Sequence, residues 1–278
     1  MKNYWVAVGV MAGFCQGGGV GKCIAEWIID GEPSIDVWAM DVARFGDYAS
    51  PQYGTIKSSE NYERRFIMTF PNETLPKGRK QKTTALYDRF VNQGAVMGDS
   101  FGLENVLWFA NNKEDAHEEP TIKRSRSHDY VSREVINVRE NVGLIEVANF
   151  SKHEFKGPDA RKFLDHVMAG KLPKPGRISL SPMLSYRGKL CGDLTVACLD
   201  ENEFMVFGSG AAQEMHRRWF ESHLDKFDVN YKNRSDEFHG ISIAGPNSRK
   251  VLEKIVRDDV SNEKFKFRDS RRMFVGGV

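Results

Sequence analysis

The chain has 278 residues, of which 40 are Lys or Arg and 38 are Asp or Glu, so its formal net charge at pH 7 is +2. That length suffices for two ordinary domains, and the charge gives no reason to expect nucleic acid or an acidic membrane surface as a partner. No apolar stretch approaches the roughly twenty residues of a membrane span. The four cysteines lack a C-x-x-C pair and the seven histidines lack metal-ligand spacing, which predicts reduced thiols in a cytoplasm or mitochondrial matrix and no metal site.

The N-terminal stretch contains a glycine cluster. An apolar run over residues 6–10 is followed by Gly17, Gly18, Gly19, Val20 and Gly21, and then by a helix-like segment over 22–29 that Asp30-Gly31 closes. We expect a strand, a glycine turn and a helix start. That geometry points unpaired N–H groups and the positive end of a helix dipole at an electron-rich ligand.

Two phosphate-binding motifs fail at this cluster. A P-loop needs G-x-x-x-x-G-K-[ST], but Gln16 stands at the first glycine position and Cys23 at the hydroxyl position. The dinucleotide fingerprint G-x-G-x-x-G would need a glycine where Lys22 stands. Two interpretations stay open: a contact with the edge of a flavin, or a glycine-rich turn packed against a neighbouring helix.

Residues 47–110 have mixed character. We expect a strand over 61–70, a loop over 71–82 that carries the basic run Lys77-Gly-Arg-Lys-Gln-Lys82, a helix over 84–93 and a strand over 95–101. Residues 111–130 are highly charged and nearly free of large apolar side chains. Such a composition predicts an exposed connection.

From residue 131 the pattern becomes regular. Strands are predicted over 142–150, 177–184, 190–199, 203–207 and 240–244. Helices are predicted from Gly157-Pro158 onward, over 211–227, and after Gly245-Pro246. The order β-α-β-β-β-α-β-α implies an α+β domain rather than a parallel sheet.

Two parts of the chain resemble one enzyme family. Residues 4–46 read YWVAVGVMAGFCQGGGVGK…AEWIIDGEP…DVWAMDVARFG, and residues 101–110 read FGLENVLWFA. Both are similar to the dimethylglycine dehydrogenase and sarcosine dehydrogenase family, in which the glycine turn lies against the flavin ring of FAD. The resemblance implies that Gly17, Gly18, Gly19, Val20 and Gly21 contact the flavin.

The C-terminal part resembles the aminomethyltransferase (T-protein) of the glycine cleavage system. The matching words are GLIEV (143–147), GPDARKFL (157–164), MLSYRG (183–188), DLTV (193–196) and IAGPNS (243–248). In that family an aspartate in a D-D-L pair lies beside the folate nitrogens. This chain has Gly192-Asp193-Leu194 there, so glycine replaces the first carboxylate of the pair, which has the catalytic role in the T-protein, and only the second remains. The resemblance implies that Asp193 is catalytic and that Tyr186 and Ser209 contact folate. The alternative for Asp193 is an aspartate that ends a tight turn after Gly188. The basic run is either a solvated loop or a contact for the folate tail.

The resemblance implies four segments: the end of an FAD-binding domain (1–46), a small central α+β domain (47–110), a charged connection (111–130) and a truncated folate-binding α+β domain (131–278). It implies a fragment, inactive alone, of an FAD- and tetrahydrofolate-dependent dehydrogenase. Its substrate would be a small N-methyl amine such as dimethylglycine or sarcosine, with an electron acceptor that the sequence does not identify. The alternative is a flavin-free folate-dependent aminomethyltransferase or folate-binding module. Nucleic acid and membrane are not expected as partners.

Overall fold

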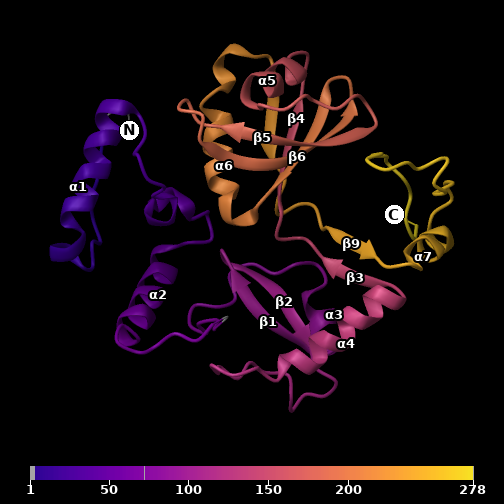
Figure 1. Ribbon diagram of the computed structural model, residues 1–278, viewed down its shortest axis with the longest axis horizontal. Helices are drawn as coiled ribbons and strands as arrows, with labels where there is room; N and C mark the ends of the chain where they lie inside the picture. The colour runs from indigo at the N-terminus through magenta and orange to yellow at the C-terminus, as the bar shows by residue number, and fades with distance from the viewer. Residues whose placement is uncertain (1–3, 72, 278) are drawn as a thin grey trace. The chain divides into compact units, whose positions relative to one another are not determined.

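The computed structural model describes residues 4–71 and 73–277. The chain divides into two compact units, Met1–Arg44 and Phe45–Val278. Helices and antiparallel sheets are both present (Figure 1), so the α+β class expected from the sequence is confirmed. The division into four segments stays a prediction.

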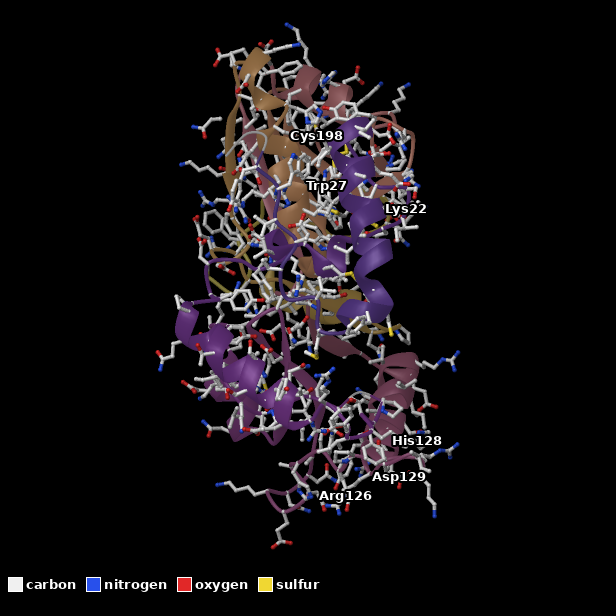
Figure 2. All side chains as sticks on the ribbon, turned by 90° about the vertical axis from the view of Figure 1, so that its left-hand side faces the viewer. Lys22, Trp27, Arg126, His128, Asp129 and Cys198 are labelled. Carbon is white, nitrogen blue, oxygen red and sulfur yellow. The ribbon has the colours of Figure 1, made fainter. Side chains whose placement is uncertain are left out.

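The first unit is built on one long helix, α1 (Gly13–Asp30), along which Lys22 and Trp27 lie (Figure 2). The expected strand and glycine turn are wrong, because residues 6–10 have no regular structure and the glycine cluster lies inside the helix. Helix extension adds one hydrogen bond for each residue that it fixes, so the helix-forming residues after Lys22 carry the helix back through the glycines. The expected end at Gly31 is confirmed: its φ is 83° and its N–H donates to the Trp27 carbonyl at 3.1 Å. Two short 3-10 turns follow, η1 (Trp38–Met40) and η2 (Val42–Arg44).

The larger unit begins with helix α2 (Pro51–Glu63), where the sequence predicts a strand over 61–70. The Ser50 hydroxyl accepts the Tyr53 N–H at 3.2 Å, and Pro51 occupies the first helical position. Both are strong signals for a helix start. Because α2 extends to Glu63 and turns follow it, the predicted strand does not form.

A hairpin follows the basic loop. Helix α3 (Tyr87–Asn92) leads into β1 (Ala95–Ser100), which pairs antiparallel with β2 (Leu103–Phe109). The predicted helix over 84–93 and strand over 95–101 are confirmed, although the helix is shorter. Phe101 and Gly102 form the turn with φ of 52° and 79°.

The charged stretch over 111–130 is more ordered than its composition predicts. The Asp115 carboxylate accepts hydrogen bonds from Asn112, from Arg126 at 2.9 Å and from the Tyr130 hydroxyl at 2.7 Å. Helix α4 (Ser127–Glu140) starts within this stretch, with Arg126, His128 and Asp129 at its N-terminal end (Figure 2). The expectation of an irregular connection is therefore wrong for its last residues.

A five-stranded antiparallel sheet with strand order β5-β6-β7-β4-β8 follows. Figure 1 labels its strands β4, β5 and β6. Its strands are β4 (Ser151–Lys156), β5 (Arg177–Leu184), β6 (Leu190–Asp200), β7 (Glu203–Gly208) and β8 (Asn230–Asn233). The predictions for β5, β6 and β7 are confirmed, whereas the sequence analysis misses β4 and β8.

One face of this sheet is covered by helices α5 (Ala160–Val167) and α6 (Gln213–Glu221), the latter preceded by η3 (Gly210–Ala212) and followed by η4 (Leu224–Lys226). Phe155, Phe163, Leu194, Val206 and Phe220 meet there and are fully buried. Burying apolar side chains of this size contributes about 1.5–3 kcal/mol each. This interface is the main core of the larger unit.

A separate two-stranded sheet pairs β3 (Gly143–Glu146) with β9 (Ile241–Ala244), and helix α7 (Ser248–Ile255) follows β9. Both strands and the helix after Gly245-Pro246 are predicted from the sequence and are confirmed. The two strands bracket the large sheet in the sequence, so they tie its entering and leaving chain segments together.

Candidate functional site: a polar cleft beside the five-stranded sheet

Two adjoining cavities, of about 130 Å³ and 340 Å³, lie within the larger unit. They share the wall residues Lys82, Leu103, Ala148, Ser235 and Asp236. The smaller cavity also contacts Asn149, Ser209, Gly210 and Gln213, and the larger one contacts Thr83, Thr84, Phe238 and His239. We call the two cavities together the cleft. Polar groups predominate in the wall of the smaller cavity, whereas the wall of the larger one mixes polar and apolar groups, which suits a ligand with both kinds of surface.

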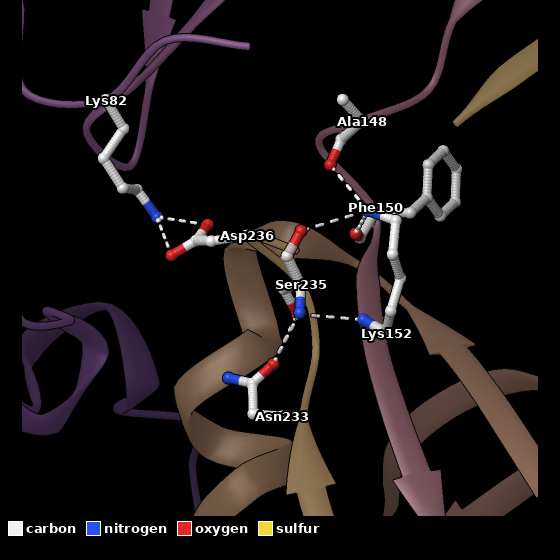
Figure 3. A network of polar contacts seen from close by, with 7 residues as sticks. All are labelled: Lys82, Ala148, Phe150, Lys152, Asn233, Ser235 and Asp236. Carbon is white, nitrogen blue, oxygen red and sulfur yellow. Dashed lines mark hydrogen bonds and ion pairs between the residues drawn. The ribbon is translucent and has the colours of Figure 1, made fainter. Parts of the chain in front are cut away.

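One wall of the cleft is fixed by a buried lysine on β4 (Figure 3). The Lys152 ammonium donates to the carbonyl oxygens of Phe150 at 2.7 Å, Ala148 at 2.8 Å and Ser235 at 3.4 Å. Its side chain is buried, and this burial lowers the pKa of the Lys152 ammonium, while the negative charge of Asp236 opposes the shift. Lys152 therefore ties the segment before β4 to the turn that carries Ser235 and Asp236.

Ser235 secures the same turn from the other side (Figure 3). Its hydroxyl accepts the Lys152 backbone N–H at 2.9 Å and donates to the Asn233 side chain at 2.6 Å. Asn233 also accepts the Ser235 N–H at 3.1 Å. Asp236 follows and forms an ion pair with Lys82 from across the cleft, with an Nζ–Oδ1 distance of 3.1 Å.

The opposite end of the cleft lies where β7 passes into α6. Ser209 lines the smaller cavity, as does Gly210 beside it. A Cβ atom on Gly210 would lie 1.9 Å from the Asn149 carbonyl oxygen, so only glycine allows the two segments to approach this closely. The sequence prediction that Ser209 contacts a ligand remains a prediction, and the position of Ser209 in a cavity wall supports it.

Asp193 lies on β6 between Gly192 and Leu194, which are both buried. Side chains alternate along a strand, so Asp193 points to the sheet face away from the helices, and its side chain is exposed. Cross-strand pairing of Thr195 with Phe207, and of Phe207 with Lys152, places Asp193 on the same face as Lys152. Asp193 is not among the residues that line the cleft. Its catalytic role stays a prediction.

Tyr186 lies apart from the cleft walls, at the tip of the β5–β6 hairpin. It is 84% exposed, and its hydroxyl shares a hydrogen bond of 2.9 Å with Nε2 of His223. Its ring lies 5.3 Å from that of Trp219. Tyr186 therefore contacts Trp219 and His223 at the surface, and the folate contact expected from the sequence remains a prediction.

The glycine cluster of α1 differs from the expected ligand-binding turn. Inside an α-helix each N–H donates to the carbonyl four residues earlier, so the amides of Gly17, Gly18, Gly19 and Gly21 do not fit the expected role as donors to a flavin. A Cβ atom at any of these four glycines would meet nothing within 4 Å. The four glycines are exposed and are distributed around the helix axis, since successive residues of a helix point to different sides. A flavin contact there stays a prediction.

Sequence reasoning missed Lys152, Asn233, Ser235 and Asp236, which build one wall of the cleft. Lys152 lies in the polar stretch Ser151-Lys-His-Glu154, which lacks the apolar alternation of a strand. The sequence analysis does single out the basic run that contains Lys82. The structure shows that Arg79 of this run forms a buried ion pair with Glu104 and that Lys82 lines the cleft, so a simple solvated loop is wrong for both residues.

Comparison with known proteins agrees with this architecture. Residues 86–278 match the family model for the GCVT N-terminal domain, and residues 30–84 match that for the FAD dependent oxidoreductase central domain. The first match covers well over half of the chain and defines the class of the protein. The chain belongs to the family that carries the GCVT N-terminal domain. Dimethylglycine and sarcosine dehydrogenases are among its relatives, which confirms the resemblance that the sequence analysis identifies.

The chain is 34% identical to the mitochondrial dimethylglycine dehydrogenase of Homo sapiens, in an alignment that covers 100% of this chain and 32% of the relative. It is 26% identical to the mitochondrial sarcosine dehydrogenase of Homo sapiens, over 100% of this chain and 35% of the relative. An aminomethyltransferase of Thermosipho melanesiensis is 29% identical over 64% of this chain and 45% of its own length. The chain thus spans about a third of the length of the dehydrogenases that it matches.

A solved structure of aminomethyltransferase T from the glycine cleavage system of Bartonella henselae has the same fold. The superposition has a TM-score of 0.50 with 21% sequence identity, and it covers 62% of this chain and 43% of that chain. Among the described residues, no helix combines the length and the apolar character that crossing a bilayer requires.

Proposed function

We propose that this chain is part of an FAD- and tetrahydrofolate-dependent dehydrogenase that removes a methyl group from dimethylglycine or sarcosine. One observation carries the proposal: a match to an FAD dependent oxidoreductase central domain precedes a GCVT N-terminal domain in a single chain. In such an enzyme FAD would take two electrons from the N-methyl amine, and tetrahydrofolate would take up the one-carbon unit as 5,10-methylene-tetrahydrofolate. The named dehydrogenases are mitochondrial, which supports the mitochondrial matrix as the compartment in a eukaryotic source.

The chain's own residues have separable roles in this proposal. The cleft would hold part of the folate, with the exposed Ser209 side chain offering a hydroxyl as donor and acceptor. Asp193 would act as the general acid–base group, holding a proton beside the folate nitrogens on the open face of the sheet. Lys152 and Ser235 would keep the cleft wall rigid, which preserves the positions of the ligand-contacting groups.

The experiment uses the polypeptide that contains this chain as the cell makes it. We expect flavin absorbance bands at roughly 370 and 450 nm that bleach on anaerobic addition of dimethylglycine or sarcosine. With tetrahydrofolate present, the product should be 5,10-methylene-tetrahydrofolate rather than free formaldehyde. A protein without flavin bands, or one whose flavin neither amine reduces, would refute the proposal.

The second candidate is a flavin-free, folate-dependent aminomethyltransferase or folate-binding module. The similarity to the aminomethyltransferase of Thermosipho melanesiensis favours it. The same absorbance spectrum separates the two candidates. A protein that binds reduced folate but carries no flavin as isolated, and acquires none on incubation with FAD, supports the second.

A further inference from the structure

Lys82 is held in place by the β1–β2 hairpin. Its backbone N–H donates to the Gly102 carbonyl at 2.8 Å, and its carbonyl accepts the Glu104 N–H at 3.0 Å. It therefore lies beside the start of β2, where it forms an isolated parallel bridge with Leu103. A lysine with its backbone fixed on both sides loses less freedom when its ammonium binds a ligand.

The loop before Lys82 is fixed as well. The Arg79 guanidinium pairs with the carboxylate of Glu104, which is 1% exposed, and donates to the Met97 carbonyl at 3.0 Å. The Glu104 hydrogen bond raises the pKa of Arg79, although its burial opposes the shift. Arg79 therefore fixes the basic run to the hairpin, and its charge is already satisfied.

The Lys82 ammonium has a weaker attachment than the other cations near the cleft. Its partner Asp236 has a side chain that is 62% exposed, and the distances from Nζ to the two carboxylate oxygens are 3.1 and 3.4 Å. An ion pair of this exposure contributes about 0–1 kcal/mol, so its carboxylate can be exchanged at little cost. The Lys152 ammonium, by contrast, already donates to three carbonyl oxygens.

We propose that Lys82 anchors a carboxylate of the ligand, which takes the place of the Asp236 carboxylate on the ammonium. This inference rests on the proposed function, which offers two sources of a carboxylate: the glutamate of a reduced folate and the N-methyl amino acid itself. Phe101 lines the smaller cavity and is 42% exposed, so an aromatic ring lies in the wall of the same cleft. A ligand with both a flat ring and a carboxylate fits these two groups.

The test measures, by calorimetry, the binding of three probes to the polypeptide that contains this chain. The probes are folinic acid, its pterin portion without the glutamate, and dimethylglycine. Lys82→Gln should weaken binding of the carboxylate source about tenfold, which corresponds to the loss of one charge-assisted hydrogen bond, and leave the glutamate-free pterin unchanged. Lys82→Arg should retain most of the affinity, and Asp236→Asn should increase it because the competing carboxylate is gone.

The matched control is Lys80→Gln, because the Lys80 ammonium lies 4.6 Å from the Tyr87 ring centroid and other residues line the cleft. A tenfold loss for folinic acid assigns Lys82 to the folate glutamate, and the same loss for dimethylglycine assigns it to the amino acid. If Lys82→Gln binds both as tightly as the unchanged chain, the inference fails while folate binding stands. If the unchanged protein binds none of the probes, the proposed function itself fails.

Discussion

His153 on β4 and His216 on α6 face each other in the core, with ring centroids 6.2 Å apart. They are 0% and 2% exposed. Nδ1 of His153 shares a hydrogen bond of 2.9 Å with the Tyr231 hydroxyl, whereas Nε2 has no hydrogen-bond partner among the described residues. Gly192 leaves the room that the His216 ring needs, since a Cβ atom there would lie 3.0 Å from its Nε2. The core therefore holds two neutral imidazoles.

Acid should unfold the protein through these two histidines. Burial lowers the pKa of His153 to about 3, with further contributions from His216 and Arg217, and burial lowers the pKa of His216 to about 4. Below the ordinary value near 6.5 the unfolded chain takes up protons that the folded chain does not. Stability should thus be constant above about pH 6.5 and fall below it, by up to about 1.4 kcal/mol per pH unit for each histidine.

Urea unfolding between pH 4 and pH 8 measures this slope. His216→Leu should flatten it by about half, whereas His128→Leu, at an exposed position on α4, should leave it unchanged. Equal slopes in the unchanged chain and His216→Leu would show that the buried pair does not set the acid sensitivity.

Replacing Lys152 tests whether the buried ammonium holds the cleft wall. Lys152→Met keeps an unbranched side chain that is one atom shorter, and it leaves three backbone carbonyl oxygens without their donor. We expect a loss of about 2–4 kcal/mol in the free energy of unfolding. Lys156→Met is the matched control on the same strand, because Lys156 pairs with Glu154 and Glu203 near the surface. Its effect should stay within about 1 kcal/mol, and similar losses in both variants would argue against the role given to Lys152.

Gly210 should tolerate no side chain. A Cβ atom would lie 1.9 Å from the Asn149 carbonyl oxygen, so Gly210→Ala must push apart two walls of the cleft. Overpacking of this kind costs about 1–3 kcal/mol, which thermal unfolding would detect. Gly54→Ala on α2, where a Cβ atom meets nothing within 4 Å, is the control and should not destabilise. An unaltered melting temperature in Gly210→Ala would mean that the two segments do not approach as described.

Alanine in the glycine cluster tests the helix assignment of α1. Within a helix, Gly18→Ala should stabilise by about 0.5–1 kcal/mol, because alanine has the higher helix propensity and meets no neighbour. Gly31→Ala, at a left-handed φ of 83°, should destabilise instead. Circular dichroism at 222 nm during heating measures both. Loss of helix signal in Gly18→Ala would favour the turn that the sequence suggests.

The sequence predicts those elements whose residues carry a local signal. Strands β5 and β6 alternate apolar side chains over 177–184 and 190–199, and Gly31 ends α1 as its conformational freedom implies. Strand β4 escapes prediction because Lys152 and His153 are polar yet buried, and their partners Ser235 and Tyr231 lie far along the chain. Ser50 and Pro51 also carry a local helix-start signal, which lies upstream of the stretch over 61–70 that is predicted as a strand.

The same difference between local signals and distant partners applies to the residues of the cleft. Ser209 was predicted through family resemblance and lines a cavity, but the Lys82–Asp236 pair joins residues that are 154 positions apart. No periodicity or motif reports such a pairing. The prediction of a turn at the glycine cluster is wrong for the opposite reason. The local glycine pattern favours a turn, but the cooperativity of the helix on its C-terminal side extends the helix through the cluster.

The central claim is that the cleft beside Ser209 holds a reduced folate, and calorimetric titration of folinic acid tests it most directly. The unchanged protein and the control Ser58→Trp, which lies on the exposed surface of α2, should bind folinic acid with equal affinity. Ser209→Trp should fill the smaller cavity and therefore weaken binding at least about tenfold, or 1.4 kcal/mol. Equal binding by all three proteins, or no binding by any of them, would contradict the account.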